Sequence, residues 1–389
     1  MEGNNRDTEL LEAVSKGDYR RMTQLVNQKA DVEVTDEMGR TPLMIAVQRN
    51  DTDAVAQLLI AGSDPNHRDI TELTPFICAG ANGFTTSLQL MATSGADVTS
   101  VNRFGGTALL PAAEKGYLHT VKACLAVGVP VDHVNHLGWS ALLEAVILGD
   151  GGRLYADVIQ TLHEAGASVH LQDFDGKSAV IYADEQKQER VLEILTDTLE
   201  DPQHPAVLEA KSYAAKNNWT AASQTVQTAL ESDGDNLDLL FYAGFYLAAQ
   251  DHYEQALEQY SRALVVAPDA LEFYFYTAYC YRLMNLTEDA LLEFDKGASL
   301  SHENAFYLYH KSNYLRELGR HEEAVEVMDE LVERHPTRYD FWFHKANSLR
   351  SLNRHQDAIT AIEHAIELQP NNPLYTNHKA QSERLLKGQ

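Results

Sequence analysis

Short apolar segments headed by a threonine or serine recur through the first half of the chain. Each heads a run with an alanine five residues later, and a second apolar segment follows in every unit. The spacing is 33 residues four times and then 38, with the five extra residues near 151–155. This pattern predicts pairs of helices, because threonine and serine cap a helix start. The heading residues are Thr8, Thr41, Thr74, Thr107, Ser140 and Ser178.

The second half of the chain repeats with a different period. Alanine recurs every 34 residues, and in each unit the eighth place is small and the eleventh is large. Small residues let two helices approach closely, and large ones fill the remaining space. The pattern therefore predicts a second helical array. The recurring alanines are Ala222, Ala256, Ala290, Ala324 and Ala358.

The first array resembles an ankyrin array of six units over about residues 8–199. The Thr-Pro start, the alanine, the turn glycine and a glycine closing the second helix recur in register. The histidine usual in this family is replaced by apolar residues such as Met44 and Ile77. Glu72 stands at a turn-glycine position, and Pro111 stands inside the first turn of a helix.

The second array resembles a tetratricopeptide (TPR) array of five units, followed by a capping helix at about residues 373–387. A proline-marked junction, Asp201 to Pro205, separates the two arrays. We therefore expect an all-α fold of two tandem helical solenoids. The domains would be 1–201, with six ankyrin units, and 203–389, with five TPR units and the cap.

The charge balance limits the class of partner. The chain has 31 basic and 57 acidic residues, a net charge of −26, and both halves are acidic. Nucleic acids and anionic membranes require basic surface, so neither is expected as a partner. No apolar run approaches the length of a membrane span, and the first residues lack the pattern of a signal peptide. Three scattered cysteines give no disulfide framework, and the expected location is the cytoplasm.

Catalytic and cofactor motifs are missing from the sequence. It contains no phosphate-binding loop, no paired-cysteine metal motif and no nucleophile elbow. His310, His344 and His378 recur at one place of three TPR units, where they could line a groove or, less simply, approach a metal. We expect no enzyme activity, no cofactor, no metal and no small-molecule substrate. The cysteines are expected to be small core residues.

In the TPR family, the first helices of the units line a concave groove. Aromatic, amide, histidine and arginine residues recur on this face, and packing does not require those residue types. Amides can bind a peptide backbone, and arginines can bind carboxylates. Alternatively, Asp238, Glu272 and Asp340 neutralise the arginines. The lysine set that binds chaperone tails in this family is missing. The predicted groove residues are Phe241, Tyr242, Phe245, Phe275, Tyr276, Tyr279, Arg282, Tyr309, His310, Asn313, Arg316, Phe343, His344, Asn347, Arg350 and Arg384.

In the ankyrin family, the turn tips and the inner helices contact partners. Apolar and aromatic residues occupy tip positions on successive units, although turns are usually polar. Exposed apolar strips mark partner surfaces, whereas side chains folded back on the next turn would be packing residues. The predicted partner surface is Met38, Ile70, Leu73, Arg103, Phe104, Leu137, Trp139, Ile147, Leu148 and Phe174.

These observations predict a non-catalytic adaptor or scaffold that binds other proteins or peptides. Its ankyrin tips would hold a folded protein, and its TPR groove would hold an extended peptide segment. A second hypothesis is a dedicated acidic inhibitor or immunity-like protein that masks one basic enzyme. A third, an enzyme with a site lacking any known motif, has no supporting residue pattern.

Overall fold

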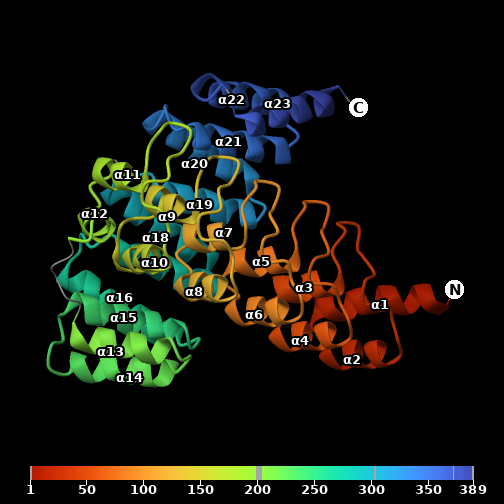
Figure 1. The fold of residues 1–389 in the computed structure, drawn as a ribbon, viewed down its shortest axis with the longest axis horizontal. Helices are drawn as coiled ribbons and strands as arrows, with labels where there is room; N and C mark the ends of the chain where they lie inside the picture. The colour runs from red at the N-terminus through yellow and green to blue at the C-terminus, as the bar shows by residue number, and fades with distance from the viewer. Residues whose placement is uncertain (1, 199–203, 302–303, 371, 388–389) are drawn as a thin grey trace. The chain divides into compact units, whose positions relative to one another are not determined.

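The computed structural model describes residues 2–198, 204–301, 304–370 and 372–387. In these residues the structure is helical, and the one β-bridge joins Gln172 to Ser178. The expected all-α fold of two helical arrays is confirmed. Figure 1 shows the helices as a succession of antiparallel pairs along each array.

The chain divides into two compact units, Met1–Asp197 and Thr198–Gln389. Most of the junction expected from the sequence, including Pro202, lies in residues 199–203, outside the described part of the chain. Pro205 is described, and it begins the first helix of the second unit, where a proline costs no backbone hydrogen bond. The domain ranges 1–201 and 203–389 stay proposals.

The first unit contains six helix pairs (Figure 1). Each helix packs on its partner in the pair and on the equivalent helix of the next pair. The helices are α1 (Glu2–Lys16), α2 (Tyr19–Asn27), α3 (Pro42–Gln48), α4 (Thr52–Ile60), α5 (Pro75–Asn82), α6 (Thr85–Thr93), α7 (Leu109–Glu114), α8 (Leu118–Ala126), α9 (Ala141–Leu148), α10 (Arg153–Glu164), α11 (Ala179–Glu185) and α12 (Glu189–Leu195).

The expected threonine and serine caps form in three pairs. Thr41, Thr74 and Ser140 each accept a hydrogen bond from the backbone N–H three residues later. Thr107 makes no such cap, because α7 begins only at Leu109 and carries Pro111 in its first turn. The proline thus shortens this helix without disturbing its packing on α5 and α9.

One acidic or amide side chain closes each turn tip. It accepts hydrogen bonds from the backbone N–H groups two and four residues later, at distances of 2.8–3.0 Å. The fourth residue of the turn is left-handed, which favours glycine. Glu72 takes this conformation with a φ of 64°, so the tip geometry holds without glycine. The closing residues are Asp36, Asp69, Asn102, Asn135 and Asp173.

Gly80 allows two neighbouring repeats to approach closely. It is buried in α5, and a Cβ atom added there would lie 2.6 Å from the carbonyl oxygen of Ala108 and 2.7 Å from its Cβ. We expect Gly80→Ala to lower the free energy of unfolding by about 2 kcal/mol, because backbone atoms cannot yield as a flexible side chain can. Urea unfolding measures the change. Gly106→Ala is the control, since its nearest atoms would lie at 3.6 Å; equal effects of the two substitutions would contradict this account.

The second unit contains five helix pairs and a final single helix (Figure 1). The five recurring alanines are fully buried where the two helices of a pair cross. The helices are α13 (Pro205–Ala214), α14 (Trp219–Leu230), α15 (Leu237–Ala248), α16 (Tyr253–Val266), α17 (Glu272–Leu283), α18 (Thr287–Leu300), α19 (Phe306–Glu317), α20 (His321–Arg334), α21 (Tyr339–Ser351), α22 (His355–Leu368) and α23 (Pro373–Leu386).

A row of ion pairs joins successive pairs in the second unit. Lys311 binds Asp295 at 2.5 Å, and the same bond recurs 34 residues later between Lys345 and Asp329 at 2.6 Å. Lys379 and Glu363 form the third member at 2.7 Å. The carboxylates are about half exposed, so each bond contributes little stability. Sequence reasoning missed this row, although the 34-residue step of the lysines was its signal.

Candidate protein-interaction surfaces

The three cysteines are buried and unpaired, as expected for core residues. Burial raises the pKa of each thiol, to about 12 for Cys78, Cys124 and Cys280, so none is a thiolate nucleophile at neutral pH. Within the residues that the structure describes, no group of three or more potential ligands could hold a metal ion. In the same residues, no helix is long and apolar enough to cross a membrane.

Part of the predicted tip surface is exposed in the first unit. Met38, Ile70 and Phe174 are 44%, 65% and 60% exposed. Arg103 is also exposed, and its guanidinium lies 4.7 Å from the ring centre of the half-buried Phe104. Leu73, the remaining exposed-side candidate, is half-buried. The apolar residues therefore remain available at both ends of the row of tips.

The remaining predicted tip and inner-helix residues are buried, so the expectation that they form an exposed surface is wrong. Leu137 and Trp139 are drawn in because their N–H groups bind the buried Asn135 side chain. Ile147 and Leu148 lie at the end of α9, on which α11 packs. A loss of binding after Trp139→Ala could therefore not be separated from a loss of stability.

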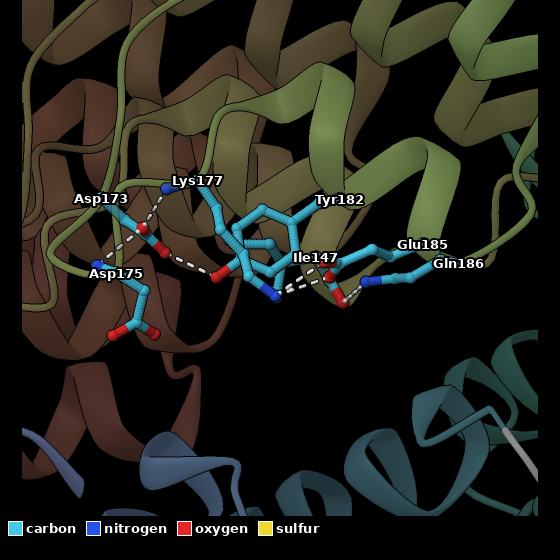
Figure 2. Close-up of polar contacts among 7 residues, drawn as sticks. All are labelled: Ile147, Asp173, Asp175, Lys177, Tyr182, Glu185 and Gln186. Carbon is cyan, nitrogen blue, oxygen red and sulfur yellow. Dashed lines mark hydrogen bonds and ion pairs between the residues drawn. The ribbon is translucent and has the colours of Figure 1, made fainter.

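The last tip shows how the array holds an exposed aromatic residue in place (Figure 2). Asp173 accepts the N–H groups of Asp175 and Lys177 and, at 2.6 Å, the hydroxyl of Tyr182 on α11. The Lys177 ammonium group binds both carboxylate oxygens of Glu185. The tip is thus tied to its own helix at two points, and Phe174 projects between them in the sequence.

Glu144 is a buried carboxyl group on the inner helix α9. Its Oε1 accepts a hydrogen bond of 2.7 Å from Asn135, whereas its buried Oε2 finds no partner among the described residues. Burial raises the pKa of Glu144 well above its usual value, and the neighbouring Glu114 raises it further. The folded protein therefore retains a proton that the unfolded chain releases.

Glu144→Gln should stabilise the protein at neutral pH. Because the folded pKa is raised, the stability of the native protein falls as pH increases above the unfolded pKa of about 4.3. Glutamine keeps the acceptor for Asn135 and has no proton to lose. We expect a gain of about 1 kcal/mol or more at pH 7.5 that shrinks toward pH 4, measured by urea unfolding. The exposed Glu185→Gln is the control; a gain independent of pH would contradict the assignment.

Most of the predicted groove aromatics are packing residues. Side chains at the fifth and sixth places of each unit insert between successive first helices, so the expectation that they line an open groove is wrong. Phe241, for example, lies 5.1 Å from Tyr242 and 5.0 Å from Tyr276, ring centre to ring centre. Phe245 and Tyr279 are half-buried. The buried members are Phe241, Tyr242, Phe275, Tyr276, Tyr309, His310 and Phe343.

The amide, histidine and arginine residues form a hydrogen-bonded ladder across α19, α21 and α23. Arg316 donates from Nη1 to Asn313 Oδ1 at 3.1 Å and to His344 Nδ1 at 3.3 Å. One unit later, Arg350 donates to Asn347 at 3.2 Å and to Gln381 at 2.6 Å. His378 Nε2 also contacts Asn347 Oδ1, at 2.8 Å. The structure thus brings six of these polar positions together.

Asn347 has an unsatisfied donor in this ladder. Its Oδ1 is fixed toward Arg350, which can only donate, so its Nδ2 points elsewhere. This buried Nδ2 finds no acceptor among the described residues. A carbonyl oxygen of a bound segment would satisfy it.

The proposed neutralisation of the arginines by carboxylates holds for one member of the register only. Arg282 binds Glu317 at 2.7 Å and lies over the Tyr314 ring. Asp340, by contrast, is fully buried and bound by both Nε and Nη2 of Arg338, a residue that sequence reasoning missed. Arg384 is exposed on α23.

His344 is held in its neutral form. Its surroundings remove water, and the adjacent Arg316 adds a positive charge, so the pKa of its imidazole falls to about 3. Because a guanidinium has no acceptor, the Nδ1 of His344 must accept the bond and its proton must lie on Nε2. The ladder is therefore unchanged by pH in the physiological range.

Family models match both units. A model of ankyrin repeats in three copies matches residues 10–102 and 76–173, and a tetratricopeptide repeat model matches residues 309–373. A model described as ChAPs (Chs5p-Arf1p-binding proteins) matches residues 179–304. Among curated proteins no match was found.

Solved structures of ankyrin proteins resemble about half of the chain. An ankyrin repeat domain from Acinetobacter baumannii is 39% identical, with 49% of this chain and 97% of that domain covered and a TM-score of 0.48. A second ankyrin repeat protein is 36% identical, with 49% and 97% covered and a TM-score of 0.47. The ankyrin repeat domain of Bcl-3 is 27% identical, with 49% and 86% covered and a TM-score of 0.45.

Arrays of both repeat types present extended surfaces that bind other proteins. The resemblances stated from the sequence are confirmed by the family models. This protein is therefore a helical repeat protein, with ankyrin repeats in its N-terminal part and tetratricopeptide and tetratricopeptide-like repeats in its C-terminal part.

Proposed function

We propose that this protein is a non-catalytic cytoplasmic adaptor that holds a folded protein on its ankyrin tips and an extended peptide segment in its TPR groove. The observation that carries the groove is the ladder on α19, α21 and α23, in which the Nδ2 of Asn347 is buried without an acceptor. Such a group costs about 1–3 kcal/mol, which a peptide carbonyl oxygen would recover.

The ankyrin surface is supported by the exposed tips. Met38 and Ile70 are joined through a backbone hydrogen bond of 3.1 Å between adjacent tips, so they present a fixed apolar pair. Fixed apolar side chains lose little entropy on binding and suit a folded partner. The net charge of −26 favours a partner with basic residues around this contact.

A peptide-library selection tests the groove. We expect enrichment of extended peptides with acidic residues or a free terminal carboxylate, and weaker binding as salt increases. Arg316→Ala with Arg350→Ala should weaken an enriched peptide about 30-fold or more, since charged hydrogen bonds are worth about 2 kcal/mol each. Selection of basic peptides, or an unchanged affinity in this variant, would exclude the groove.

The adaptor and the inhibitor hypotheses differ in the number of partners. Affinity purification from the native host should recover several proteins for an adaptor and one dominant basic protein for an inhibitor. Met38→Ser with Ile70→Ser should release the folded partner and keep the peptide. Loss of both ligands in this variant would contradict two separate surfaces.

A further inference from the structure

The groove arginines recur in one register, and the structure gives them different surroundings. Arg282 has its charge neutralised by Glu317, and Arg350 is bound through both Nη1 and Nη2 to amide oxygens. Arg316, between them, is partly buried and is held by neutral groups only. Among the described residues, no carboxylate forms an ion pair with it.

The bonds of Arg316 leave one edge of its guanidinium open. Nη1 carries two hydrogen atoms, and Asn313 and His344 use both. The N–H groups of Nε and Nη2, which lie side by side on the other edge, find no acceptor in the described parts of the chain. Two parallel N–H groups match the two oxygens of a carboxylate.

The nearby acidic residue does not compete for this edge. Asp340 lies close enough to influence His344, but both of its oxygens are bound by Arg338 at 2.7–2.8 Å. The positive charge of Arg316 thus remains for a ligand. Its partial burial makes an ion pair there stronger than one at a wet surface.

We propose that the Nε–Nη2 edge of Arg316 is the carboxylate-binding subsite of the groove, with Asn313 and His344 as positioning residues. This inference rests on the proposed peptide groove and assigns its anion contact to one arginine of the register. The carboxylate comes from an Asp or Glu side chain or from a chain terminus. A phosphate dianion fits less well, because the net charge of −26 repels it more strongly.

The subsite has an unusual pH property for a site containing histidine. The groups that face His344 are Arg316, Arg338 and Asp340, together with the ring of Tyr309 at 5.5 Å. The imidazole remains neutral down to low pH, so it keeps accepting the bond from Arg316. Carboxylate binding should therefore change less than twofold between pH 8 and pH 5.5, where Asp, Glu and terminal carboxyls are still ionised.

Titration calorimetry of the full-length protein with acetylated alanine-based hexapeptides tests the subsite. One probe has a free C-terminal carboxylate, one has an internal glutamate and a C-terminal amide, one is neutral, and one carries phosphoserine. We expect either carboxylate probe to bind at least tenfold more tightly than the neutral one. The tighter of the two identifies the source of the carboxylate.

Single variants assign the contact. Arg316→Gln should abolish the tenfold preference, Arg316→Lys should keep part of it, and the register-matched control Arg282→Gln should keep it within twofold. Circular dichroism melts confirm that each variant is folded, and 15N shifts of the His344 ring, assigned with His344→Gln, report its tautomer independently of peptide binding.

Several outcomes would overturn the subsite. These are equal losses in Arg316→Gln and Arg282→Gln, tighter binding as pH falls through 6.5, titration of His344 near that pH, or a preference for phosphoserine. If the neutral probe binds as tightly as the carboxylate probes, the peptide groove stands and the subsite fails. If no probe binds and the library yields no enrichment, both proposals fail.

Discussion

Replacing Phe241 with alanine should lower the free energy of unfolding of the second unit by about 4 kcal/mol. The side chain is fully buried in α15 and contacts the rings of Tyr260, Phe273 and Tyr276 at 5.0–6.4 Å between centres. Truncation removes this buried area and leaves a cavity among aromatic neighbours that cannot collapse, which costs 3–5 kcal/mol for phenylalanine. The geometry of the ring pairs adds about 0.5–1.5 kcal/mol for each contact.

Phe245 provides the matched control for this prediction. It lies one turn later on the same helix, is half-buried and stacks on Phe241 at 6.3 Å. Phe245→Ala should therefore cost about half as much or less, since part of the ring is already in water. Hydrogen exchange of the amides in α15 and α17 measures both losses within the unit. Equal losses would show that Phe241 is a surface residue after all.

This contrast shows what the repeat pattern could predict. The period and the recurring small residues were enough for the helix pairs, because those positions are fixed by the contact between two helices. The same register places Phe241 and Phe245 on one face of α15. Only the neighbouring helix α17 decides that Phe241 is covered and Phe245 is not, and that packing is not encoded in the spacing of a single helix.

The polar positions of the groove show the same limit in another form. Arg282, Arg316 and Arg350 are identical in sequence register, and their difference arises from Glu317 and Gln381, residues outside or at the margin of the predicted set. The partner of Asp340 was missed because Arg338 precedes α21 and lies outside the helical repeat. An ion pair across a helix start has no periodic signal.

The buried tips of the first unit failed for a related reason. Turns are expected to be polar, so apolar residues there suggest a partner surface. The side chain of Asn135, which is itself buried, closes the turn and carries Leu137 and Trp139 inward. In the tips at Asp36 and Asp69 the same closure leaves Met38 and Ile70 outside, so the local motif alone does not determine exposure.

Removal of the Arg338 side chain should destabilise the second unit by about 3 kcal/mol or more. Asp340 is fully buried, and both of its oxygens are bound by this guanidinium. Arg338→Ala would leave a buried carboxylate without its cation, which is more costly than the loss of an exposed pair. It would also remove the contact of the guanidinium with the Phe341 ring, at 4.3 Å.

Two further variants separate these contributions. Lys345→Ala breaks an ion pair whose carboxylate, Asp329, is 54% exposed, so it should cost no more than about 1 kcal/mol. Arg338→Ala combined with Asp340→Ala removes the stranded charge and should recover a large part of the stability lost in the single variant. Urea unfolding followed by circular dichroism measures all three. If the double variant is as unstable as Arg338→Ala, the loss arises from the contact with Phe341 and not from the buried charge of Asp340.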